Sequence, residues 1–192
     1  MAINKKRLQG AAETTALVPG ENFNTVIYTG TGGTQNITGV GFAPDFVWIK
    51  KRSSATSAQN MLQDTVRDIG GSGGAFILYS DSTEAQATNA DTNYFSAFGT
   101  DGFTLGGNTY YNGNNETYVA WCWKADTDFS HSASGSGSGS TLVSSGKSNQ
   151  PAGFSIVKFT VPSVSSGQSR KIKHNLGDIP ELIIYKTLNS SQ

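Results

Sequence analysis

Few residues of this chain have the type and spacing that catalysis requires. His131 lies in a Ser/Gly-rich stretch and His174 in a turn, where little would hold an imidazole within the tolerance of general acid–base chemistry. Asp126 and Asp128 flank Thr127 and could bind a cation, but the full Asp-x-Asp-x-Asp-Gly pattern of a calcium loop is missing. We therefore expect structural or solvated roles for these side chains.

Two glycine-containing segments resemble phosphate-binding loops only in part. Gly146-Lys147-Ser148 matches the end of a P-loop, but Thr141 stands where the motif needs its first glycine. Gly30-Thr31-Gly32-Gly33 follows an expected strand but leads into another one, which is typical of a hairpin loop. No nucleotide site is predicted, and the sequence favours a protein that is not an enzyme and holds no cofactor or metal.

The strongest candidate for ligand contact is a pair of tyrosines beside asparagines. Tyr110 and Tyr111 precede Asn112 and Asn114, next to the turn signal Asn112-Gly113. Rings supply contact area and amides supply hydrogen bonds, a combination that suits sugar or protein ligands. The alternative is a loop whose tyrosines fold back onto the strands.

Other aromatic residues fit a packed interior. Trp121 and Trp123 are two residues apart, so on a strand they face the same side, and we expect them to fill a sandwich core. Cys122 would then be a small buried hydrophobic residue. As the one cysteine, it excludes an intrachain disulfide framework and a thiolate metal cluster.

The composition of the chain argues against several classes of partner and location. The chain has 192 residues, 23 of them glycine, and 14 basic residues balance 14 acidic ones. A net charge of zero argues against nucleic acid or an anionic membrane as an electrostatic partner. No apolar run approaches the roughly 20 residues that span a bilayer, so membrane insertion is not expected. Lys5, Lys6 and Arg7 precede no apolar segment, so the start does not read as a secretory signal.

The chain contains an internal repeat with two anchors. Phe23–Thr29 is similar to Phe154–Thr160, and Gly41–Lys50 is similar to Gly177–Lys186. A period this long indicates a duplicated domain and not a solenoid. We expect four parts: an N-terminal arm at 1–21, a β-sandwich module at 22–128, a Ser/Gly-rich flexible linker at 129–151, and an incomplete second copy at 152–192.

The second copy ends two expected strands in. Either the chain is part of a longer protein, which we favour, or another chain completes the second unit. Within the arm, residues 5–17 could form a helix.

Short apolar runs between glycine-rich turns predict an all-β fold, an antiparallel sandwich of jelly-roll or concanavalin-like type followed by the start of a second similar domain. Asp81–Ala90 could form one or two helical turns. The expected strands are Phe23–Thr29, Asp45–Lys50, Ala75–Tyr79, Tyr94–Phe98, Phe103–Leu105 and Thr117–Lys124.

These motifs resemble a repeat of tail fibre and other virion structural proteins of tailed bacteriophages, notably marine phages and cyanophages. The resemblance is carried by Gly153–Thr160, by His174–Ile184, and in the first unit by Gly41–Lys50, Asp101–Gly106 and Tyr118–Ala125. It implies a concanavalin-like or laminin-G-like sandwich repeated along a virion appendage, with no catalytic residues. The first unit has no counterpart of His174, so that histidine is not essential to the module.

The resemblance leads to a functional expectation. The chain would be the N-terminal part of a tail fibre or similar appendage, made in the host cytoplasm and carried on the virion. Its arm would contact other virion proteins (a tail adaptor, nozzle or capsid), and it would form a homo-oligomer, commonly a trimer in fibres. The alternatives are a lectin-like module that binds a host surface glycan and a capsid-decorating protein.

Overall fold

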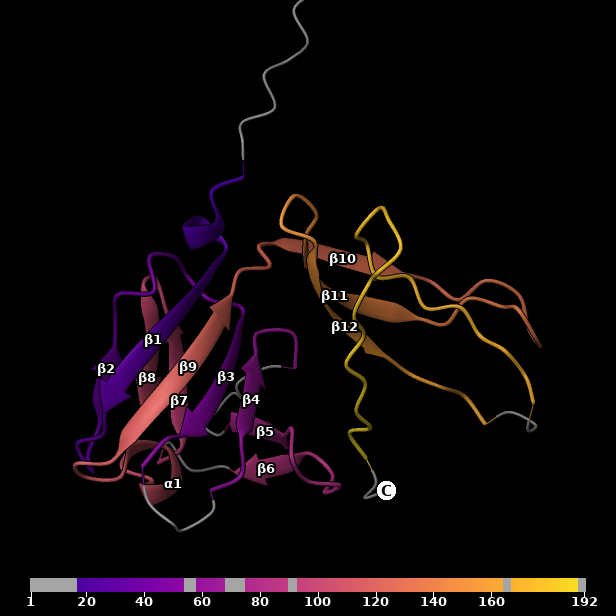
Figure 1. Cartoon of the computed structure of the whole chain (residues 1–192). Coiled ribbons are helices and arrows are strands. Elements are labelled where there is room, and N and C mark those ends of the chain that lie inside the picture. The colour runs from indigo at the N-terminus through magenta and orange to yellow at the C-terminus, as the bar shows by residue number, and fades with distance from the viewer. Residues whose placement is uncertain (1–16, 54–57, 68–74, 90–92, 164–166, 190–192) are drawn as a thin grey trace, which may run out of the picture.

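Residues 17–53, 58–67, 75–89, 93–163 and 167–189 are described by a computed structural model, and within them the chain is almost entirely β (Figure 1). The helical segments of these ranges are a short 3-10 turn, Pro19–Glu21, and one four-residue helix, α1 (Thr109–Asn112). All strand pairs are antiparallel. The predicted all-β sandwich is confirmed, whereas the helical arm falls mostly outside the described residues.

The larger sheet of the sandwich has six strands in the order β1-β9-β3-β4-β5-β6. Strand β9, which is late in the sequence, lies between two early strands, and its whole length pairs with β1. This pairing closes the first unit by joining its beginning to its end. The strands are β1 (Phe23–Thr29), β3 (Phe46–Lys51), β4 (Met61–Asp64), β5 (Ala75–Tyr79), β6 (Ala87–Asn89) and β9 (Thr117–Trp123).

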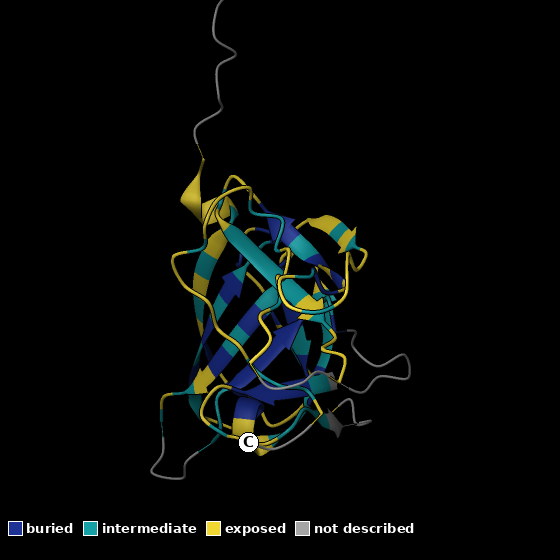
Figure 2. Ribbon diagram, turned by 90° about the vertical axis from the view of Figure 1, so that its right-hand side faces the viewer, coloured by how far each residue is buried: buried dark blue, intermediate teal, exposed yellow. Residues whose placement is uncertain are grey.

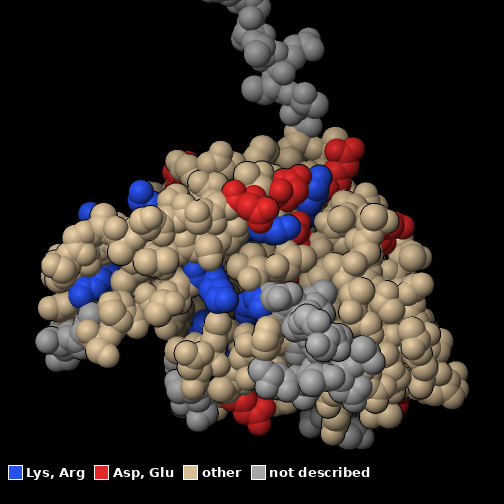
Figure 3. Space-filling view, turned by 180° about the vertical axis from the view of Figure 1, so that it is seen from behind, with Lys and Arg blue, Asp and Glu red and all other residues tan. Residues whose placement is uncertain are grey.

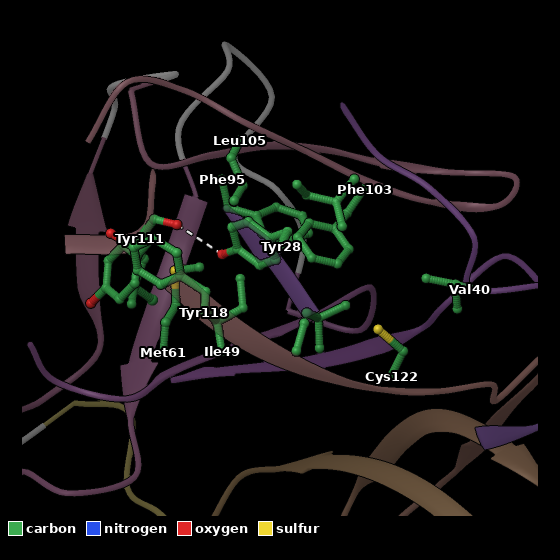
Figure 4. Packing of buried hydrophobic residues seen from close by; sticks show 14 of the residues in the cluster. Tyr28, Val40, Ile49, Met61, Phe95, Phe103, Leu105, Tyr111, Tyr118 and Cys122 are labelled. Carbon is green, nitrogen blue, oxygen red and sulfur yellow. Dashed lines mark hydrogen bonds between the residues drawn. The ribbon is translucent and has the colours of Figure 1, made fainter. Parts of the chain in front are cut away.

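A three-stranded sheet, β2 (Gln35–Ile37), β8 (Gly102–Leu105) and β7 (Phe95–Gly99), forms the second layer. Side chains of both sheets make one buried cluster (Figure 4). The rings of Tyr28 and Tyr118 stack with centroids 5.0 Å apart, and Phe95 stacks on Phe103 at 5.4 Å. Figure 2 shows the buried residues on the strands and the exposed ones mainly on connecting loops.

The face that β9 buries is the opposite of the one predicted. Tyr118, Ala120 and Cys122 are fully buried, whereas Trp121 and Trp123 lie half-buried on the outer face of the sheet. The inward positions after Tyr118 are small, and rings of the opposite sheet fill the interior. The expectation that the two tryptophans form the core was therefore wrong, although Cys122 is the small buried residue expected.

A third sheet is present where a flexible linker was predicted. Strands β10 (Thr127–His131), β11 (Ser144–Asn149) and β12 (Phe154–Phe159) form a three-stranded sheet beside the sandwich (Figure 1). The prediction of a flexible tether was wrong because ladder hydrogen bonds come from the backbone and form with serine and glycine as well. The ring of Phe129 also lies across its partner Gly146, which supplies packing that glycine lacks.

The six strands predicted in the first unit are confirmed within one residue at each end. Two other expectations fail. In the segment predicted as helical turns, Asp81–Ala90, the described residues 81–89 form a turn and then strand β6, and Ala90 lies outside the described residues. In the second copy, Phe154–Thr160 contains β12 as expected, but Leu182–Lys186 is not assigned to a strand.

Burial makes Cys122 a sharp probe of the native state. Its side chain is inaccessible and desolvation raises the pKa of the thiol to about 12. Since the thiolate is the reactive form, we expect no labelling by a disulfide reagent at pH 8 in the folded chain and stoichiometric labelling in denaturant. Rapid labelling without denaturant would contradict the packing of β9.

Candidate functional site

The structure separates the four residues predicted to bind a ligand. Tyr110 is 49% exposed and Asn114 is exposed, but Tyr111 is 2% exposed and Asn112 is fully buried. The predicted hairpin tip is helix α1, capped by the side chain of Asn108, which accepts from the backbone N–H of Tyr110. Tyr111 and Asn112 therefore cannot contact a glycan, and the alternative of tyrosines folding back holds for Tyr111.

The side chain of Asn112 joins α1 to two loops, the one between β1 and β2 and the one after β8. Its side-chain amide donates to the carbonyl oxygens of Gly33 (2.5 Å) and Gly106 (2.8 Å), and its Oδ1 accepts from the backbone N–H of Thr31 (3.0 Å). The backbone carbonyl of Tyr111 accepts from the Tyr28 hydroxyl at 2.8 Å. The side chain of Asn112 and the Gly106 carbonyl are buried, so these bonds satisfy polar groups that would otherwise lack partners, and we assign Tyr111 and Asn112 structural roles.

Replacing Asn112 tests this assignment. We expect Asn112→Ala to lower the free energy of unfolding by about 1–3 kcal/mol, because buried donors and acceptors lose their partners. Asn114→Ala removes the same group two residues away at an exposed position and should change stability little. Urea unfolding measures both, and equal effects of the two variants would contradict the structural role of Asn112.

The contact between the sandwich and the third sheet has a polar centre at Asp45, just before β3. Its carboxylate accepts from the backbone N–H of Ala125 (2.9 Å), the hydroxyl of Thr65 (2.8 Å) and the ammonium of Lys147 (2.9 Å). The Asp45 side chain is only 9% exposed, so water screens this ion pair less than a surface pair. Lys147, in β11, thereby fastens the third sheet to the sandwich.

The pKa of Lys147 reflects this contact. Partial burial lowers the pKa, whereas the hydrogen bond and negative charge of Asp45 raise it, and the net shift is upward. A raised pKa means that the protonated Lys147 contributes stability that is present below the usual lysine pKa and is lost as the pH rises through the folded-state value.

Aromatic rings form the apolar part of the same contact. Phe154 of β12 stacks on Trp123 of β9 with centroids 5.8 Å apart and lies 6.0 Å from the ring of Phe46. Phe23 packs on Trp123 at 4.8 Å. Phe23 and Phe154 are equivalent positions of the internal repeat, so both units begin with a phenylalanine that contacts the same tryptophan.

A groove of about 410 Å³ lies where the two parts meet near the start of the described chain. The Nδ2 of Asn149 donates to Oδ1 of Asn22 (2.6 Å), and that of Asn175 donates to the Ser148 hydroxyl (2.9 Å). Amides both donate and accept, so such a lining suits hydroxyl-rich or peptide ligands. The polar lining also includes Gln150, Thr127 and the carboxylates of Glu21 and Asp126, and the apolar lining is Leu17, Val18 and Pro151.

Charged groups near this contact are mixed in sign. Lys124 pairs with Asp126 at 3.1 Å. Figure 3 shows Lys and Arg side chains lying among Asp and Glu side chains at the top of the face it presents. This arrangement agrees with the net charge of zero and gives no single-sign surface there for a polyanion.

The P-loop-like triplet and the two histidines considered for catalysis do not form a common site. Gly146-Lys147-Ser148 is part of β11, His131 ends β10, and Nδ1 of His174 accepts from the N–H of Leu176 at 3.3 Å. Among the residues that the structure describes, no three His, Cys, Asp or Glu side chains gather around a possible metal position. The helices of these ranges are also too short to cross a membrane.

Sequence reasoning missed the Asp45–Lys147 pair. The two residues are far apart in the chain, and the strand that carries Lys147 has no apolar alternation to reveal it. The one available signal was the Gly-Lys-Ser triplet, whose lysine is a lone charge within a Ser/Gly stretch.

Comparison with known proteins gives a family without a known role. A profile described as "Domain of unknown function (DUF7483)" matches residues 18–192. The chain belongs to this family. The matched region runs through the sandwich, the third sheet and the segment after it, so the family covers both units together. No curated protein and no solved structure matched the chain.

Proposed function

We propose that this chain is a structural part of a phage virion, the N-terminal portion of a tail fibre or similar appendage. The motif resemblance at Gly41–Lys50 and His174–Ile184 supports this assignment. The arm before residue 22 would attach to a tail adaptor, nozzle or capsid protein, and the β units would carry distal parts outward. Copies of the chain would associate, as subunits of fibres commonly do.

The observation that carries the proposal is the firm joint between the two β units. A stacked ring pair, Trp123–Phe154, and a partly buried ion pair, Asp45–Lys147, hold the third sheet on the sandwich. Asn149 adds a hydrogen bond to Asn22 across the same contact. An appendage must transmit its orientation from one domain to the next, and a joint of this kind does so better than the expected tether.

The location can be tested on particles. We expect gold-labelled antibodies against the full chain to mark a tail appendage of phages that encode it, as seen by electron microscopy. Labelling of the capsid surface would favour the capsid-decorating alternative. Recovery of the chain only outside purified particles would contradict a virion role.

A lectin-like function is the second candidate, and the amide-lined groove favours it. Hydroxyl-rich ligands need paired donors and acceptors, which Asn175, Gln150 and Glu21 present there. This position differs from the sequence-predicted one, of which Tyr110 and Asn114 remain exposed.

A glycan array with the full chain tests the second candidate. We expect any host glycan that binds to lose affinity in Asn175→Gly, which removes the amide and tolerates the positive φ of 57° at that position. Tyr110→Ala is the matched variant on the other surface and should bind normally. A loss of glycan affinity in Tyr110→Ala alone would place the site at α1. Absence of binding to any glycan would leave only the structural role.

A further inference from the structure

An unusually apolar run is exposed near the end of the described chain. Ile179 is 86% exposed, Ile183 is 73% exposed and Tyr185 is 60% exposed, and Leu182 and Ile184 between them are also exposed. We call residues 182–185, the counterpart of residues 46–49, the apolar strip. Single exposed apolar side chains are normal on a protein surface, whereas a contiguous set marks an interaction site.

The internal repeat shows what such residues do elsewhere in this protein. With Pro180 aligned on Pro44, Ile183 corresponds to Val47 and Tyr185 to Ile49. Both counterparts lie in β3 and are fully buried in the sandwich core. The strip therefore has the composition of an interior strand, in a position where the described residues leave most of it exposed.

Two backbone positions before the strip have the same sign of φ as their counterparts before β3. Gly39 and Gly41 precede β3 with φ of 85° and 87°, and the aligned Asn175 and Gly177 have φ of 57° and 80°. Both copies therefore have positive φ at the same two positions before the second anchor. Beyond these positions they differ, because β3 forms ladders and Leu182–Lys186 does not.

The difference has a simple cause in the sheet order. In the first unit β9 lies between β1 and β3 and bonds to both. In the second unit β12, the counterpart of β1, pairs only with β11 among the described strands, which leaves its other edge unpaired. A strand equivalent to β9 is absent from the described part of the second unit.

Both ends of the strip are anchored. At its start, the Ser155 hydroxyl of β12 donates to the carbonyl of His174, at 2.6 Å. At its end, the Leu188 carbonyl accepts from the N–H of Gln86 at 3.1 Å, and the Lys186 ammonium donates to the carbonyl of Ser82. The strip is therefore held near the edge of β12 and is not a free tail.

We propose that the apolar strip and the free edge of β12 form a docking surface for one extended β-strand of a partner polypeptide, with the alternating aromatic and small apolar pattern of β9. Backbone groups of β12 would bond to the incoming strand, and its inward side chains would cover Ile183 and Tyr185. The inference rests on the internal repeat and is independent of the proposed function.

One ring contact specifies the partner further. In the first unit Tyr28 stacks on Tyr118 of β9, with centroids 5.0 Å apart. Phe159, the counterpart of Tyr28, stacks instead on Tyr185, with centroids 5.9 Å apart. The incoming strand would take the place of Tyr185 against Phe159, so it needs an aromatic residue at the position equivalent to Tyr118.

A labelled peptide with the sequence of residues 117–124, in which C122S prevents oxidation, tests the proposal against the full chain by fluorescence anisotropy. We expect saturable binding that weakens at least about tenfold in the chain variant Ile183→Asp, because a carboxylate would enter an apolar contact. Ile179→Asp is the matched control: it makes the same change at an equally exposed isoleucine, but its counterpart Ala43 is exposed and precedes β3. It should bind as the unchanged chain does.

Three results would overturn the proposal. They are absence of peptide binding, equal weakening by both variants, and peptide binding that survives Tyr118→Ala in the peptide. Sedimentation of the chain without peptide supplies a separate outcome: if it forms dimers that Ile183→Asp dissociates and the peptide does not compete, the strip binds a second copy of the chain instead. Circular dichroism of both variants, whose altered side chains are exposed, establishes that they are folded.

Discussion

The antiparallel pairing of β9 with both β1 and β3 is the constraint on which the rest of this protein depends. It joins the beginning and end of the first unit, and its alternation decides which side chains face the core. Tyr118, Ala120 and Cys122 point inward, so Trp121 and Trp123 must lie outside. Because Trp123 is outside, it is available to pack on Phe154 of the next unit.

The joint between the units follows from this arrangement. Asp45 precedes β3 and accepts from the N–H of Ala125, just after β9, so its carboxylate is fixed by the same strand pair. A fixed carboxylate can hold Lys147 without the entropy cost of ordering a mobile partner. The ion pair and the stacked rings therefore act together, and the orientation of the third sheet depends on how β9 sits in the sandwich.

The same pairing explains why two similar sequences differ in whether they form strands. Phe154–Phe159 becomes a strand because β11 is beside it, whereas Leu182–Lys186 forms none although its counterpart in the first unit does. Strand formation requires a neighbour that supplies hydrogen bonds and cover, and apolar composition is not sufficient. An unpaired strand edge beside exposed isoleucines is the kind of surface that folded proteins normally protect.

The residue order by itself determined six strands of the first unit, because alternating β-branched and aromatic residues between glycine turns mark half-buried strands, but it did not reveal β2, β4 or β6. It also determined the repeat and the burial of Cys122. Only the tertiary structure decided that Asn112 is buried while Tyr110 is exposed, and that β9 buries Tyr118, Ala120 and Cys122 instead of its tryptophans. It also decided that Lys147 lies in a strand and pairs with Asp45. These features depend on which distant segment lies alongside, and local patterns carry no record of that, least of all where serine and glycine form a strand through backbone hydrogen bonds alone.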